Sequence, residues 1–131
     1  MHVEIETTDR VDVVDVTDRV AAAVPDDCAA GTCHVFVRHT TAGLVVQERE
    51  SRLLADLTDR LADLVPASDG YRHDELDGNA DAHLRAALLG PSVTVPVRDG
   101  SLALGTWQSL LLVECDGPRT REVAVTVTPA D

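Results

Sequence analysis

Several residue types that most soluble proteins use freely are scarce in this chain of 131 residues. Lysine is absent, so all eleven basic residues are arginine, and the aromatic residues are one Trp, one Tyr and one Phe. With aromatic residues at 2%, valine, leucine and alanine must fill the hydrophobic core. A hydrophobic share of 44% excludes an intrinsically disordered chain. The length suits one domain, which we expect to span residues 1–131.

Other absences restrict the location of the protein and the chemistry that a motif could identify. No apolar run approaches the length of a membrane span, and the first residues, MHVEIETTDR, lack the apolar region of a signal peptide. Cys28, Cys33 and Cys115 have no CxxC spacing, which favours reduced thiols over a disulfide framework. The motifs HExxH, GxGxxG, GxSxG and the Walker loop are also missing. We therefore expect a cytoplasmic protein whose site no short motif identifies.

The charge is strongly one-sided. The 23 acidic residues against 11 basic ones give a net charge of -12. Because the acidic residues are dispersed, the pattern favours a solvated surface suited to high salt over a cation-binding cluster. We infer a halophilic cytoplasm as the setting. Such a surface repels phosphate backbones and anionic membranes, so neither nucleic acid nor a membrane is an expected partner.

Alternation of apolar and polar residues predicts a mainly antiparallel sheet. We expect a tight turn at Gly43 and a hairpin turn at Asp99-Gly100. The strand patterns cover residues 2–7, 11–16, 32–41, 43–48, 91–97 and 121–128, and a further apolar segment follows the hairpin turn.

Helical patterns interrupt these strands. Residues 50–64 place leucines on one face and acids and arginines on the other. Residues 18–24 predict a short helix with Thr17 as its N-cap, and residues 80–90 predict another with Asn79 as its N-cap. The sequence therefore predicts a single α/β domain in which two to three helices interrupt the sheet.

Polar residues in apolar elements are the candidates for function. Period two puts His39 at the inner end of the buried face that Val35 and Val37 begin, where a histidine is more often a satisfied core residue than a ligand. His83 falls near the start of a helix, which favours a neutral imidazole suited to metal binding or to acting as a base. His73, in a polar loop, is either a solvated residue or part of the same site.

Two carboxylates have equally plausible structural explanations. Asp81 precedes His83 in the first helical turn, but it can also pair with Arg85 at i+4. Glu114 ends a very apolar strand and is costly to bury unless Arg119 or Arg121 pairs with it. Sequence spacing alone does not establish that any of these groups converge.

Three stretches together resemble a known family: HTTAGLVVQE (39–48), GNADAHLRAALLGPSVTVPV (78–97) and LGTWQSLLLVECDGPR (104–119). They are similar to the YjbQ-like family, also called the secondary thiamine-phosphate synthase family, over nearly the whole chain. The resemblance implies a barrel-like antiparallel sheet and a homotrimer. Many relatives carry Asn-Glu-Asn where this chain has Gln47-Glu48-Arg49, so Arg49 places a cation beside the acid.

The resemblance also implies a polar pocket. This pocket would contain His39, His73 and His83. Three histidines with Glu48 nearby would suit a divalent ion such as zinc or magnesium with an activated water, and we expect His83, Asp81 and Glu48 to be the catalytic residues. The expected substrate-binding residues are Thr40, Asn79, Thr106, Trp107, Gln108 and Arg119.

The activity that the resemblance implies is weak synthesis of thiamine phosphate. A thiazole phosphate nitrogen attacks the methylene of a pyrimidine diphosphate, and diphosphate leaves, which requires stabilisation of negative charge. One alternative is a metal-dependent hydrolase or lyase that acts on an unknown phosphorylated small molecule, with synthesis incidental. Another is a non-catalytic metabolite-binding trimer.

Overall fold

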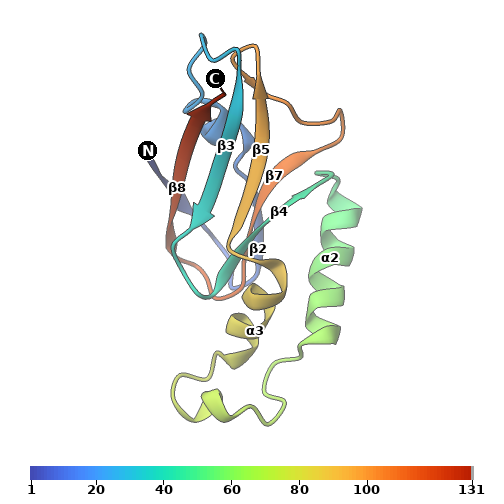
Figure 1. The fold of residues 1–131 in the computed structure, drawn as a ribbon. Helices are drawn as coiled ribbons and strands as arrows, with labels where there is room; N and C mark the ends of the chain where they lie inside the picture. The colour runs from blue at the N-terminus through green and yellow to red at the C-terminus, as the bar shows by residue number, and fades with distance from the viewer. Residues whose placement is uncertain (131) are drawn as a thin grey trace.

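Two antiparallel sheets curl against each other in the computed structural model, which describes residues 1–130 (Figure 1). One sheet has the strand order β1-β8-β3-β5-β6, and the other has β2-β7-β4. With three α-helices between the strands, this half-barrel confirms the predicted α/β fold. The elements are β1 (His2–Glu6), β2 (Asp12–Asp15), α1 (Thr17–Ala21), β3 (Ala30–Val37), β4 (Ala42–Gln47), α2 (Ser51–Leu64), the 3-10 helix η1 (Arg72–Glu75), α3 (Ala80–Leu89), β5 (Ser92–Arg98), β6 (Ser101–Leu102), β7 (Ser109–Glu114) and β8 (Thr120–Pro129).

The main core lies between the two sheets and consists of aliphatic side chains, as the composition requires. Alternation along β3 buries Cys33, Val35 and Val37, while the residues between them are exposed. On β7, Leu110 and Leu112 belong to the same hydrophobic cluster and are fully buried. The sheets therefore pack through a layer of small branched side chains.

A second, smaller core lies on the other side of β7, where α2 and α3 approach it. Val113 of β7 packs there with Leu61 of α2 and Ala82 of α3. The predicted leucine face of α2 is only partly covered, because Leu53 is 36% exposed and Leu64 is 73% exposed. No helix in residues 1–130 is long and apolar enough to cross a membrane.

The strand that was predicted to run to residue 41 is shorter than its alternation suggested. β3 ends at Val37, so His39 lies in the connection to β4 and not on the strand face. The backbone N–H of Val37 donates to the carbonyl of Pro91 at 2.8 Å, and the N–H of Arg38 donates to that of Glu122 at 3.2 Å. The chain turns over residues 38–41, and this turn carries the polar side chains of the candidate site.

The predicted turn at Gly43 is also wrong, since Gly43 lies inside β4. A Cβ atom at this position would lie 2.6 Å from Cβ of Leu89 and 3.0 Å from the carbonyl oxygen of Gly90. The next residue, Leu44, donates its N–H to that same oxygen at 3.0 Å. Glycine therefore lets the C-terminal end of α3 pack closely on β4, which helps to fix α3 relative to the sheets.

Thr17 does not cap the first helix as predicted. α1 begins at Thr17 itself, and the residue at its N-cap position makes no capping hydrogen bond through its side chain. The hydroxyl of Thr17 donates to Oδ1 of Asp15 at 2.6 Å and accepts from the N–H of Leu110 at 2.9 Å. Thr17 thus ties α1 to β7 instead of satisfying the helix end.

Candidate functional site

A polar cavity of about 450 Å³ opens where three connections meet. These are the turn between β3 and β4, the segment that leads into α3, and the connection between β7 and β8. We call this cavity the histidine pocket. Its lining residues are Arg38, His39, Thr40, Thr41, Asp77, Asn79, His83, Asp116, Arg119 and Arg121.

His39 is held in one tautomer by the backbone. Its Nε2 accepts a hydrogen bond from the N–H of Glu122 at 2.8 Å. Burial, and then the positive charge of Arg121, lower the pKa of His39 below its ordinary value. The ring is therefore neutral and carries its proton on Nδ1, so it offers the pocket a hydrogen-bond donor.

Replacement of His39 by glutamine is expected to remove a pH-dependent part of the stability. Because the pKa of His39 is lowered in the folded protein, the unfolded chain binds the proton first as the pH falls. The contribution is fully present above the unfolded pKa of about 6.5 and is lost as the pH falls towards the folded value. Urea denaturation at about pH 7.5 and about pH 5.5 should show a larger loss for wild type than for His39→Gln.

The buried carboxyl groups do not confuse this comparison between about pH 7.5 and about pH 5.5. The carboxyl groups of Asp81 and Glu114 have lowered pKa values, so both stay ionised across this pH range. Equal losses of unfolding free energy in wild type and His39→Gln would contradict the assigned tautomer and the neutral ring.

A buried ion pair lies beneath the turn that carries His39. Glu114 is 0% exposed and Arg121 is 2% exposed. Arg121 Nε donates to Glu114 Oε1 at 2.8 Å, and Nη2 donates both to Glu114 Oε2 and to the hydroxyl of Thr41, the latter at 2.8 Å. Burial acts to raise the pKa of Glu114, but the hydrogen bonds from Arg121, the backbone of Asp116 and Thr7, together with the charge of Arg121, outweigh it and lower the pKa. Of the two partners proposed for Glu114, Arg121 is therefore the one that pairs with it.

Two further histidines lie beside each other, His73 in η1 and His83 in the first turns of α3. The rings of His73 and His83 make an edge-to-face contact with their centroids 4.7 Å apart. Together they line a second, more apolar cavity of about 450 Å³, so His83 borders both this cavity and the histidine pocket. Nε2 of His73 is buried without a hydrogen-bond partner among residues 1–130.

Asn79 occupies the predicted N-cap position of α3, but its side chain does not cap the helix. Its amide nitrogen donates to Oδ2 of Asp116 at 3.0 Å, and Oδ1 of Asp74 accepts from the N–H of Ala80 at 2.9 Å instead. Oδ1 of Asn79 is buried and has no partner among the described residues. This leaves an acceptor in the pocket that a ligand's donor could satisfy.

The predicted three-histidine metal site does not fit this arrangement. His39 uses the lone pair of Nε2 to accept from Glu122, so only the protonated Nδ1 remains. Within residues 1–130, no group of three or more His, Cys, Asp or Glu side chains is arranged to hold a metal ion. A divalent metal, zinc or magnesium, stays a prediction from the histidine cluster, and no step below depends on one.

Asp81 is buried in ion pairs. Its carboxylate is 1% exposed, and both of its oxygens accept from the guanidinium of Arg10 at 3.0 Å. Nη2 of Arg85 lies 3.5 Å from Oδ2, which is the i+4 pair that the sequence suggested as an alternative. Burial acts to raise the pKa of Asp81, but the hydrogen bonds and charges of the two arginines lower it. Its predicted catalytic role therefore competes with a structural one.

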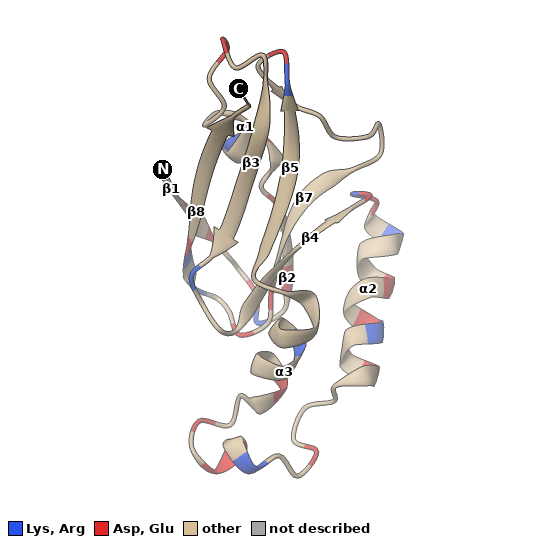
Figure 2. Ribbon diagram, in the orientation of Figure 1, with Lys and Arg blue, Asp and Glu red and all other residues tan. Residues whose placement is uncertain are grey.

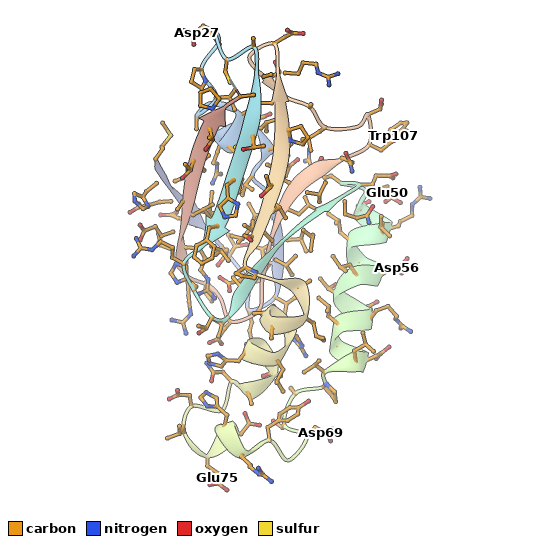
Figure 3. The ribbon with its side chains drawn as sticks, in the orientation of Figure 1. Asp27, Glu50, Asp56, Asp69, Glu75 and Trp107 are labelled. Carbon is orange, nitrogen blue, oxygen red and sulfur yellow. The ribbon has the colours of Figure 1, made fainter. Side chains whose placement is uncertain are left out.

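The remaining predicted residues lie at the other end of the smaller sheet. Gln47 pairs with Ser109 at one end of the β4–β7 ladder, and Ala42 pairs with Glu114 at the other. Five residue steps separate these ends, or about 17 Å. Glu48 and the segment 106–108 adjoin the first end, where Figure 3 shows Trp107 near Glu50, and the histidine pocket adjoins the second.

Arg49 does not disturb Glu48 in the way its position suggested. Nε of Arg49 lies 3.7 Å from Oδ2 of Asp15 on β2, so its charge is directed to that strand. The backbone N–H of Glu48 donates to Oε1 of Gln47 at 2.9 Å. Glu48 is thus held at the end of β4, away from the histidines.

Sequence reasoning missed several residues of the site. Arg38 lines the histidine pocket and donates to Oε1 of Glu122 at 3.1 Å; its position next to His39 was the available signal. Thr41 links the turn to the buried ion pair. Nothing in the sequence pointed to the contact of Arg10 with Asp81, because 71 residues separate them.

Comparison with known families accounts for the whole described chain. A family model described as "UPF0047 protein YjbQ-like" matches residues 1–130. The chain belongs to the UPF0047 YjbQ-like family. A UPF0047 protein of Archaeoglobus fulgidus is 50% identical over 125 residues, covering 95% of this chain and 98% of the relative. One from Methanothermobacter thermautotrophicus is 45% identical and covers 94% and 87%.

Solved structures of similar proteins share this fold. A YbjQ-like protein of unknown function from Sulfolobus solfataricus superposes with a TM-score of 0.94 at 36% identity, over 99% of this chain and 96% of that one. A conserved hypothetical protein from Thermus thermophilus gives a TM-score of 0.89 at 39% identity, over 98% and 99%. These likenesses confirm the family and the fold that the three quoted stretches predicted.

Proposed function

We propose that this protein binds a phosphorylated small molecule in the histidine pocket and acts on it, with thiamine-phosphate synthesis as a secondary activity. The observation that carries the proposal is the set of donors around one cavity. Arg38 and Arg119 are both more than half exposed there, and His39 adds a neutral N–H. Guanidinium groups and N–H donors are the protein groups that match phosphate oxygens best.

The arginines keep donors free for such a ligand. Arg119 donates from Nε to the carbonyl of Asp116 at 2.8 Å and from Nη2 to its carboxylate at 3.1 Å. Its other N–H groups remain available, since a guanidinium carries five. The contacts with Asp116 fix the orientation of the Arg119 guanidinium and leave its other N–H groups free to bind a ligand.

The proposed reaction fits these groups. As the thiazole nitrogen forms a bond to the methylene carbon, the bond from that carbon to diphosphate breaks, and diphosphate leaves with the bonding pair. Arg38 and Arg119 would stabilise the charge on the departing group, which is the main requirement of this step. His83, which borders the pocket, is positioned to exchange a proton with a bound molecule.

Inorganic diphosphate is the probe that tests this pocket. Calorimetric titration at low ionic strength should show binding that Arg119→Ala weakens about tenfold or more, because a charge-assisted hydrogen bond is lost. Arg98→Ala is the matched control, since Arg98 is an exposed arginine at the far end of β5. Equal affinities in wild type and Arg119→Ala would overturn the proposal.

Turnover separates the enzyme from the binding protein. With a pyrimidine diphosphate and a thiazole phosphate supplied, His83→Ala should lose product formation while it still binds diphosphate. Release of phosphate from other phosphorylated substrates, with no thiamine phosphate formed, would favour the hydrolase or lyase. Binding without any product in wild type would favour a metabolite-binding role.

We also propose the homotrimeric assembly that the family resemblance implies. Large apolar side chains stay exposed in a single chain, among them Leu64 at 73% and Leu88 at 65%. An assembly would remove them from water. Light scattering gives the mass that tests this part of the proposal.

A further inference from the structure

The segment between β6 and β7 holds the chain's only tryptophan out in solvent. Trp107 is 74% exposed, and its indole is the largest of the exposed apolar side chains in residues 1–130. The N–H of Gly105 donates to Oε1 of Gln108 at 2.8 Å, and the N–H of Gln108 donates back to the carbonyl of Gly105 at 3.1 Å. Ala103 anchors the segment to Pro96 of β5 through a further hydrogen bond of 2.8 Å. The indole is thus presented on a preorganised turn, and not on a loose loop.

A complementary hollow lies on the opposite part of the molecule. It has a volume of about 440 Å³ and lies between the end of α2 and the outer face of α3. We call it the leucine groove. Its main walls are Leu64, Pro66, Tyr71, Leu84 and Leu88.

The leucine groove is continuous with the candidate site. Tyr71 and Leu84 line both the groove and the cavity that His73 and His83 share. An aromatic group placed in the groove would therefore lie beside the two histidines that border the histidine pocket.

Trp107 cannot reach the groove of its own chain. Figure 3 shows Trp107 beside the start of α2, near Glu50, whereas Asp69 on the rim of the groove lies beyond the other end of that helix. α2 has 14 residues, which corresponds to about 21 Å. Only a second molecule can bring the two surfaces together.

Charge favours a second copy of this chain as the occupant. Two copies with a net charge of -12 repel each other unless they meet through uncharged surfaces. Residues 101–109 carry no charged side chain (Figure 2), and the leucine groove has Asp69 as the one acid in its lining. These two surfaces are where acidic copies can approach.

We propose that Trp107 of one copy inserts into the leucine groove of the next and forms a wall of that copy's site beside His73 and His83. The two surfaces differ, so the contact is head-to-tail, which is the type of contact that a closed homotrimer requires. An exposed, rigidly held indole facing an apolar hollow has the character of an interface hot spot. The contact itself does not depend on the proposed ligand.

The single tryptophan makes the contact measurable. In the wild-type assembly the emission of Trp107 should be blue-shifted, as for a buried indole. Leu88→Asp, in the leucine groove and far from Trp107 in the same chain, should shift that emission to the red and lower the mass found by light scattering. Leu76→Asp is the control, because Leu76 is 78% exposed but does not line the groove, and it should change neither.

Two outcomes overturn the proposal: a water-like emission in the intact wild type, or emission and mass that Leu88→Asp leaves unchanged. Diphosphate binding by Arg119→Ala is measured separately, so failure of the contact and failure of the proposed function are distinguishable.

Cross-linking covers the case in which Leu88→Asp does not fold. Trp107→Cys and Leu88→Cys proteins, mixed under oxidising conditions, should form a disulfide-linked dimer that neither forms alone. Cys28, Cys33 and Cys115 are 6%, 0% and 1% exposed, so they do not compete. A mixture without the cross-linked dimer would contradict the contact.

Discussion

Arg121→Met is expected to cost about 3 to 5 kcal/mol of unfolding free energy, because it leaves a buried carboxylate without its counter-charge. Glu114 would keep its hydrogen bonds from the hydroxyl of Thr7 at 2.8 Å and from the backbone N–H groups of Cys115 and Asp116, but none of these donors carries a charge. Urea denaturation near neutral pH measures the loss.

The pH dependence should distinguish this cause from loss of packing. In wild type the pKa of Glu114 is lowered, so its contribution is present above the unfolded value and is lost as the pH falls through the folded one. Without Arg121, burial dominates and raises that pKa, so the deficit of Arg121→Met should shrink as the pH falls. A deficit that grows on acidification would contradict the account.

A double variant and an exposed arginine are the matched controls. Arg121→Met with Glu114→Gln removes both charges and should recover much of the stability, because neutral groups are cheaper to bury than a single charge. Arg98→Met, at an exposed position, should stay within about 0.5 kcal/mol of wild type. A double variant as unstable as Arg121→Met would show that shape, and not charge, causes the loss.

The buried pair also positions the site. The carbonyl of Thr41 accepts from Nη2 of Arg121 at 3.2 Å and from the N–H of Cys115 at 3.1 Å, which fixes the end of the turn that carries His39. The residue after Arg121, Glu122, donates its N–H to His39. Diphosphate binding should therefore weaken in Arg121→Met even under conditions where that variant is folded.

The elements that the sequence predicted well are those in which local pattern and packing agree. Alternation predicted β8 and the buried face of β3, and the 50–64 pattern predicted α2 to within a residue. Asp99 and Gly100 form the expected turn because both adopt positive φ angles, 50° and 75°.

The failures have a physical reason as well. Alternation could not show where β3 ends, because His39 and Thr41 continue the two-residue period after the strand has stopped at Val37. At that point the backbone N–H groups of Val37 and Arg38 bind the carbonyls of Pro91 and Glu122, which the sequence pattern does not reveal. Gly43 was interpreted as a turn residue, although its role is to let α3 approach, and that contact is tertiary.

The candidate site depended on resemblance far more than on pattern. No spacing rule brings His39 and His83 to one cavity, yet both line it with Thr40, Asn79 and Arg119, as the family resemblance implied. The same resemblance grouped Glu48 and Trp107 with them, and the β4–β7 ladder places those two at the opposite end. Glu48 and Trp107 could lie beside the histidines only if a second copy of the chain brought them there.

Asp81→Asn is the second change with a large expected effect. It is expected to cost about 3 kcal/mol, because the buried guanidinium of Arg85, which is 5% exposed, loses its charged partner. Nε of Arg85 would still donate to the carbonyl of Val65 at 3.0 Å, which compensates only one of its donors. The cost should be near the lower end of the range for buried pairs, since Arg10, the other partner, is partly in water.

This variant decides between the two roles of Asp81. A structural role predicts that Asp81→Asn has a lower melting temperature than wild type. Under conditions where the variant is folded, it should bind diphosphate with wild-type affinity and turn over substrate at the wild-type rate. A catalytic role predicts normal stability and lost turnover. Arg10→Gln is the matched test, because Arg10 pairs with Asp81 but does not line the histidine pocket. If Asp81 has a structural role, Arg10→Gln should reproduce part of the loss of stability. Full stability with no turnover in Asp81→Asn would support a catalytic role for Asp81.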